Sequence, residues 1–91
     1  MYDKYSKIPR YVIESKLSSN AKILYGEITL LCYKEGFCFA SNKYLANTIH
    51  VSERTITRLV SELEYQNLIT VEHSKGNIRK IYVIDKNVYH S

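Results

Sequence analysis

Residues 51–69 read VSERTITRLVSELEYQNLI, and this stretch decides how the rest of the chain is organised. Apolar side chains recur in it at helical intervals, at Ile56, Leu59, Val60 and Leu63. Ser52 stands where a side-chain oxygen caps a first turn, and Asn67 is the non-glycine residue best suited to a left-handed helix end. The spacing therefore predicts an amphipathic helix over 52–67.

The opposite face of this helix is polar and cationic. Because a helix advances about 100° per residue, that face receives Arg54, Arg58, Ser61 and Tyr65, with Thr55 and Thr57 on its flanks. One face of the helix thus suits a protein core, while the other displays two guanidinium groups among hydroxyls.

A shorter helix is expected just before this one. Ser41 is placed to cap a helix over 42–49, which would bury Ala46 and Ile49 together with either Tyr44 or Leu45. His50-Val51 then forms the turn into the second helix. A short helix, a tight turn and a longer helix define a helix-turn-helix.

The N-terminal half predicts a long helix after a short helical turn at 11–14. Ser18 or Ser19 would cap it, and Gly36 would end it with a positive φ angle, so that it runs to about residue 34. Its apolar positions repeat at intervals of three and four, at Ala21, Leu24, Tyr25, Ile28, Leu31 and Cys32.

Three β-prone segments complete the pattern. Residues 37–40 are short and aromatic, and 68–72 and 79–84 flank a loop over 73–77 that contains Gly76-Asn77. Val71, Ile81 and Val83 would face the core, and Lys80 and Tyr82 would face away. The loop and its shoulders carry Lys75, Arg79 and Lys80, with no acid between Glu72 and Asp85, so this hairpin is expected to be a basic wing. The expected fold class is α+β, a winged helix-turn-helix with about three helices and a small antiparallel sheet that includes the 37–40 strand.

Composition fits one small soluble domain that favours polyanionic partners. The 91 residues carry a net charge of +4 and a pI of about 9.1. We expect an N-terminal arm over 1–10, the domain over 11–84 and a short tail over 85–91. No apolar run is long enough for a membrane span, and the start Met1-Tyr2-Asp3-Lys4 lacks a secretory signal, so a cytoplasmic location is expected.

Neither metal binding nor catalysis is indicated. Cys32 and Cys38 are interpreted as small reduced core residues, and His50, His73 and His90 do not form a ligand cluster with them. The chain has no nucleophile elbow and no phosphate-binding glycine loop. We therefore expect no enzyme, no metal and no cofactor.

The chain also resembles a known family. The residues that carry the resemblance are, in order, Lys7-Ile8-Pro9, Leu17-Ser18, Ala21-Lys22, Leu24-Tyr25, Gly36-Phe37-Cys38, Ser41-Asn42, Leu45-Ala46, Val51-Ser52, Thr55, Leu63 and Leu68-Ile69. Over residues 7–84 the chain resembles the N-terminal winged-helix domain of phage and plasmid replication-initiation proteins, including DnaD-like replisome organisers. Residues 51–63 alone also resemble MarR-type transcription regulators. Asn67 departs from the glycine that is usual in these families, and Glu53 departs from the arginine that regulators often carry.

The resemblance implies double-stranded DNA binding in replication initiation of a phage, plasmid or mobile element, by a homodimer or higher oligomer that meets replisome proteins. A transcriptional repressor of the same fold, and a winged-helix protein-interaction module, are the alternatives. The helix over 52–67 would enter the major groove, while the start of the shorter helix and the wing would hold phosphates. The predicted DNA-contacting residues are Ser41, Asn42, Lys43, Ser52, Arg54, Thr55, Thr57, Arg58, Ser61, Lys75, Asn77, Arg79 and Lys80.

Overall fold

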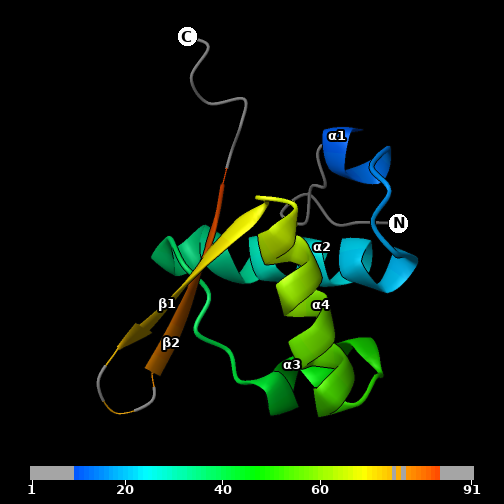
Figure 1. The fold of residues 1–91 in the computed structure, drawn as a ribbon. Coiled ribbons are helices and arrows are strands. Elements are labelled where there is room, and N and C mark those ends of the chain that lie inside the picture. Colours follow the sequence, from blue (N-terminus) through cyan, green and yellow to red (C-terminus); the bar gives the residue numbers. More distant parts are fainter. Residues whose placement is uncertain (1–9, 75, 77, 85–91) are drawn as a thin grey trace, which may run out of the picture.

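The computed structural model describes residues 10–74, 76 and 78–84. Within them the chain forms four helices and one hairpin (Figure 1). The elements are α1 (Arg10–Ile13), α2 (Ser19–Glu35), α3 (Asn42–Ile49), α4 (Glu53–Tyr65), β1 (Ile69–Ser74) and β2 (Ile78–Val83). The expected short turn at 11–14 is thus a separate fourth helix. The arm over 1–9, the tail over 85–91, Lys75 and Asn77 lie outside the described residues, and Arg10 is the first residue of α1.

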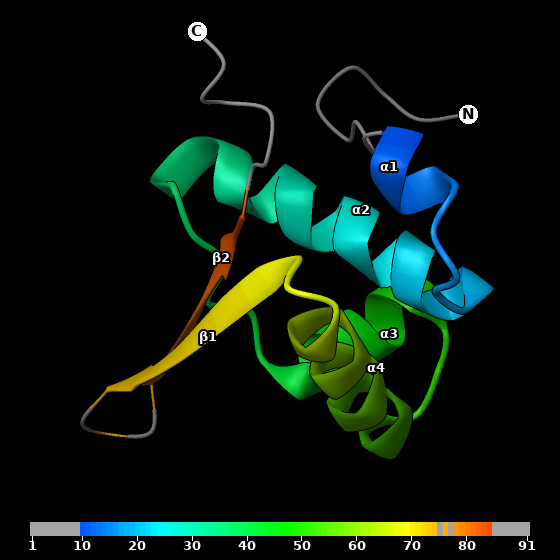
Figure 2. The same ribbon diagram turned by 45° about the horizontal axis from the view of Figure 1, so that its top comes forward.

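The helices pack around one core, and the hairpin projects from it. α2 crosses α4, α3 lies against the first turns of α4, and the β1–β2 hairpin extends to one side (Figures 1 and 2). All helices and the base of the hairpin contribute fully buried side chains, including Val12, Leu24, Leu45, Leu59 and Ile81. The apolar spacing in the sequence is therefore confirmed as a core stripe.

Helix ends form where the predicted capping residues stand. Ser18 caps α2, because its hydroxyl accepts from the amide of Ala21 over 3.2 Å. Gly36 ends α2 with φ of 85° and donates its N–H to the carbonyl of Cys32. Such backbone geometry favours glycine because an L side chain clashes there.

The shorter helix buries Leu45 and leaves Tyr44 about half exposed, which resolves the alternative that the sequence left open. Ile49 is only partly buried against the core. In α4, Ile56, Leu59 and Leu63 are fully buried. α4 therefore has one face fixed in the core.

The hairpin residues face the sides that the sequence predicted. Val71 pairs with Ile81 and Ile69 with Val83, and all four pack on or within the core. Lys80 and Tyr82 point to the other face, where the ring of Phe37 lies 5.9 Å from that of Tyr82. The strand expectations for this hairpin are therefore confirmed apart from shifts at the ends.

The predicted strand at 37–40 is wrong. This segment makes a single antiparallel bridge between Cys38 and Ile81, closed by two hydrogen bonds of 2.8 Å. It leaves the left-handed Gly36 and must reach the α3 cap at Ser41, so only one residue lies alongside β2. Beyond Cys38, the carbonyl of Ala40 accepts a hydrogen bond from the Arg79 side chain.

Four helices with a two-stranded antiparallel hairpin after α4 make the predicted α+β winged helix-turn-helix. No helix in the described part of the chain has the length and apolar character to cross a bilayer.

Candidate nucleic-acid interface

The geometry of α3, the turn and α4 is set by three capping residues. Ser41 accepts from the amide of Tyr44 over 3.0 Å and starts α3. His50 ends α3 in the left-handed region with φ of 62°, and the amide of Val51 bonds back to Ala46. Ser52 then accepts from the amide of Thr55 over 3.1 Å and starts α4. The hydroxyls of Ser41 and Ser52, both predicted site residues, thus hold the helix starts.

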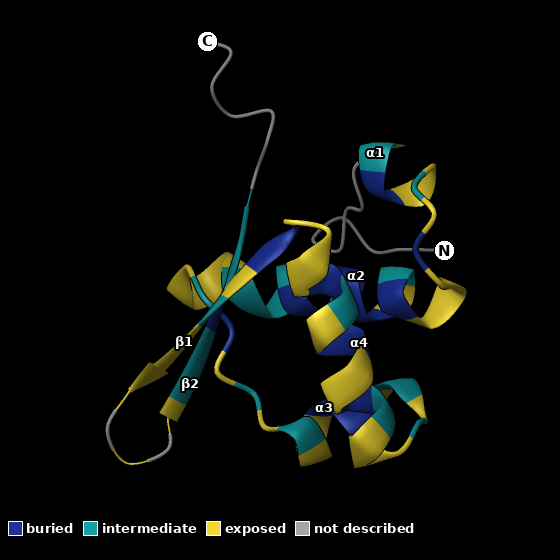
Figure 3. Cartoon of the chain, viewed as in Figure 1, coloured by how far each residue is buried: buried dark blue, intermediate teal, exposed yellow. Residues whose placement is uncertain are grey.

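The outward face of α4 is open to solvent. Arg54, Thr57, Arg58 and Ser61 are exposed, while the core-facing residues of the same helix are buried (Figure 3). Thr55 is partly buried, and its hydroxyl accepts from that of Ser52 over 3.0 Å. No segment in the described part of the chain covers the two arginines.

The arginines of α4 have no acidic partner among the described residues. Glu62, one turn beyond Arg58, turns toward α2, where its two carboxylate oxygens accept from the amide of Ser18 over 2.9 Å and from its hydroxyl over 3.0 Å. Glu64 and Glu53 make no ion pair within the described residues, where Arg10 and Glu14 form the single salt bridge. Within the described residues the guanidinium groups of Arg54 and Arg58 are therefore not paired with a carboxylate.

Three predicted site residues from separate elements meet between the wing and α3. Arg79 of β2 donates to Oδ1 of Asn42 over 2.6 Å and to the carbonyl of Ala40 over 2.7 Å. Asn42 donates to Oγ1 of Thr57 over 3.1 Å. Arg79 and Asn42 also line an open cavity of about 570 Å³ beside His73 and Ile78. Sequence spacing could not show this contact, because the bonded residues are far apart in the chain.

The other wing cations are placed differently. Lys80 lies over the Phe37 ring, with its Nζ 4.8 Å from the ring centroid, and stands opposite Glu72 in the ladder. Since neighbouring residues of a strand point to opposite faces, Lys80 and Arg79 do not share a surface. Lys43 is exposed at the start of α3. Lys75 and Asn77, both predicted DNA contacts, lie outside the described residues.

The two cysteines lie between α2 and the sheet. Cys38 is buried and Cys32 half-buried, and both are free thiols. Burial raises the pKa of Cys32 to about 11 and also raises the pKa of Cys38, so both remain protonated at neutral pH. Within the described residues no three or more potential ligands cluster to hold a metal ion.

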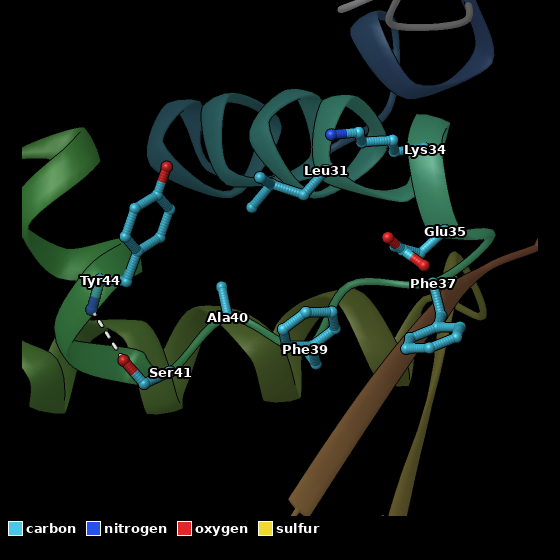
Figure 4. Close-up of a pocket in the computed structure, with 8 residues that line it drawn as sticks. All are labelled: Leu31, Lys34, Glu35, Phe37, Phe39, Ala40, Ser41 and Tyr44. Atoms are coloured by element: carbon cyan, nitrogen blue, oxygen red, sulfur yellow. Dashed lines mark hydrogen bonds between the residues drawn. The ribbon is translucent and has the colours of Figure 1, made fainter.

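The structure has a second concave surface that was not predicted from the sequence. An open groove of about 510 Å³ lies between the C-terminal end of α2 and the start of α3, with Leu31, Phe39 and Tyr44 directed into it (Figure 4). None of its lining residues belongs to α4. The groove is therefore separate from the arginine-bearing face.

Comparison with known families identifies the central part of the chain. The sequence model of the family described as "Helix-turn-helix domain" matches residues 15–69, which is more than half of the chain. No curated protein and no solved structure matches the chain. The matched range begins before α2 and ends at the first residue of β1.

Proposed function

The chain belongs to the family of helix-turn-helix domains, and we propose that it binds double-stranded DNA through the outward face of α4. The observation that carries the proposal is the exposure of Arg54 and Arg58 without an acidic partner among the described residues. Exposed guanidinium groups that are not held in an ion pair, on the second helix of this motif, suit a polyanion.

In the proposed complex α4 lies in the major groove, which is about 12 Å wide and admits a helix. Arg54 and Arg58 make bidentate hydrogen bonds to the O6 and N7 atoms of guanine, the geometry that suits a guanidinium. Ser61 and the flanking Thr55 contact neighbouring bases or sugars, and the flanking Thr57 contacts a thymine methyl through its own methyl group. These assignments remain predictions from position and chemistry.

Backbone phosphates are assigned to the margins of α4. We propose that Ser41, Lys43 and Ser52 meet phosphates at the two helix starts, and that Lys75, Asn77 and Lys80 do so from the wing. Asn42 and Arg79, also predicted contacts, lie between α3 and the wing, on the face of β2 opposite to Lys80. With four to six neutralised phosphates, log affinity should fall with log salt at a slope of about −4 to −5.

The biological setting proposed is replication initiation of a phage, plasmid or mobile element. Its support is the ordered resemblance of residues 7–84 to the winged-helix domains of replication-initiation proteins. A transcriptional repressor would use the same contacts on an operator. Selecting binding sites from the DNA of the phage, plasmid or mobile element separates the two roles. A replication initiator would select repeats at an origin, whereas a repressor would select operators near promoters.

The small size of the module supports binding to DNA by more than one copy. One recognition helix covers few base pairs, and two-fold dimers on repeated half-sites extend the contact. We propose that two or more copies bind together on DNA. Measuring the mass of the protein–duplex complex by light scattering gives the number of copies directly.

The variant R54A/R58A tests the function. Fluorescence anisotropy with a labelled duplex should show its affinity reduced on the order of a hundredfold, since each bidentate base contact contributes about 1–3 kcal/mol. K16A/K34A is the matched control, because it removes two exposed cations outside α3, α4 and the wing. Equal affinities for the two double variants would refute the proposal and favour the protein-interaction alternative.

A further inference from the structure

A chain of hydrogen bonds links the wing to α4 through the first residue of α3. The Nη1 and Nη2 atoms of Arg79 donate to Oδ1 of Asn42 and to the carbonyl oxygen of Ala40. The Nδ2 atom of Asn42 donates in turn to Oγ1 of Thr57. We call these three side chains, Arg79, Asn42 and Thr57, the wing relay.

The relay ties down the part of the hairpin that the core does not hold. The bridge between Cys38 and Ile81 is the last backbone pairing of β2 with the 37–40 segment, and the pairs of Arg79 and Ile78 lie farther out on the wing. An isolated two-stranded hairpin is marginally stable in water. The bonds of Arg79 to Ala40 and Asn42 therefore fix the direction in which the outer wing leaves the core.

The side chains of the wing relay already form hydrogen bonds within the protein in the absence of DNA. The hydroxyl of Thr57 accepts from Asn42 and donates its single proton to the carbonyl of Glu53 over 3.4 Å. The guanidinium of Arg79 spans two acceptors at once, which its planar fork allows and a lysine ammonium on a flexible stem does not reproduce. Asn42 uses both ends of its amide, so it joins Arg79 of the wing to Thr57 of α4.

We infer that Asn42 is a positioning residue that holds the wing in a fixed orientation to α4, so that both meet one duplex as a single preorganised surface. The inference rests on the proposed DNA binding and deepens it. Arg79 acts through Asn42 and Ala40 instead of reaching DNA as a free wing cation. A preorganised surface binds more tightly because less conformational freedom is lost on association.

A double-mutant cycle on duplex affinity tests the relay. N42A should weaken binding on the order of tenfold, the effect expected from losing one or two net hydrogen bonds. T57V removes the hydroxyl that receives the Asn42 bond and should weaken binding less. The double variant N42A/T57V should bind like N42A, because the second change removes a bond that is already absent.

The duplex affinity of R79K distinguishes a positioning role of Arg79 from a direct contact between its charge and a phosphate. The variant keeps the positive charge, so a free phosphate contact would leave the affinity near the wild-type value. The relay instead predicts a loss comparable to that of N42A. N47A is the matched control, since Asn47 is an exposed asparagine on the same helix, and its affinity should equal that of the wild type.

Melting temperatures are recorded for every variant, and binding is measured well below them. If N42A does not fold, T57V and R79K carry the test. Additive effects of N42A and T57V, or an R79K variant that binds like the wild type, would overturn the relay. The proposed DNA binding would still stand if R54A/R58A loses affinity. A wild-type protein that binds no duplex would overturn both.

Discussion

Arg58 and Glu62 lie one helical turn apart and serve different parts of the molecule. The spacing suits an ion pair on the helix surface, yet the carboxylate of Glu62 accepts two hydrogen bonds from Ser18. A carboxylate at the start of α2 also interacts favourably with the positive end of that helix. The acid is thereby removed from the arginine face, and α4 is fastened to α2.

E62A should therefore destabilise the fold without weakening DNA binding. Loss of the two bonds to Ser18 should lower the free energy of unfolding by about 1 kcal/mol, as measured by urea denaturation. E64A is the control, because Glu64 is exposed on the same helix and has no side-chain hydrogen bond within the described residues. Equal stability of E62A and the wild type would show that the Ser18 bonds contribute nothing.

At the scale of the element, α4 ends in a motif that turns the chain into the wing. Asn67 has φ of 60°, and its amide donates to the carbonyl of Glu64 over 2.9 Å. The amide of Leu68 donates to the carbonyl of Leu63 over 3.0 Å. This bond pair is a Schellman motif with asparagine in the left-handed position. The buried Leu63 and Leu68 then lie together and direct Ile69 into β1.

Residue 67 should affect the stability of the fold only through its tolerance of a left-handed backbone. N67A should lower the free energy of unfolding by about 1 kcal/mol, because alanine tolerates a left-handed backbone less well than asparagine. N67G should be at least as stable as the wild type. Thermal or urea unfolding of the two variants checks this, and a more stable N67A than N67G would contradict it.

At the scale of the whole molecule, sequence patterns predicted the helices and their caps because these depend on neighbouring residues. Ser41, Ser52 and Gly36 act where their chemistry placed them. The 37–40 strand was not predictable, because aromatic content does not reveal how many partners a segment will find. The bonds of Glu62 to Ser18 and of Arg79 to Asn42 join residues 44 and 37 positions apart, and local spacing carries no signal for them.

The residues predicted to contact DNA fall into two groups in the structure. Arg54, Arg58 and Ser61 share the open face of α4, whereas Asn42, Thr57 and Arg79 bond to one another. The sequence predicted the helices and the hairpin that carry these residues. It could not distinguish the side chains that are free from those that are already engaged, because that depends on tertiary contacts.

The central claim is that the outward face of α4 meets duplex DNA, and an NMR titration of the labelled protein with a short duplex tests it most directly. The account predicts that the amide signals of Arg54, Arg58 and Ser61 shift together with those at the start of α3. Shifts confined to the groove lined by Leu31, Phe39 and Tyr44, with the signals of α4 unchanged, would contradict it.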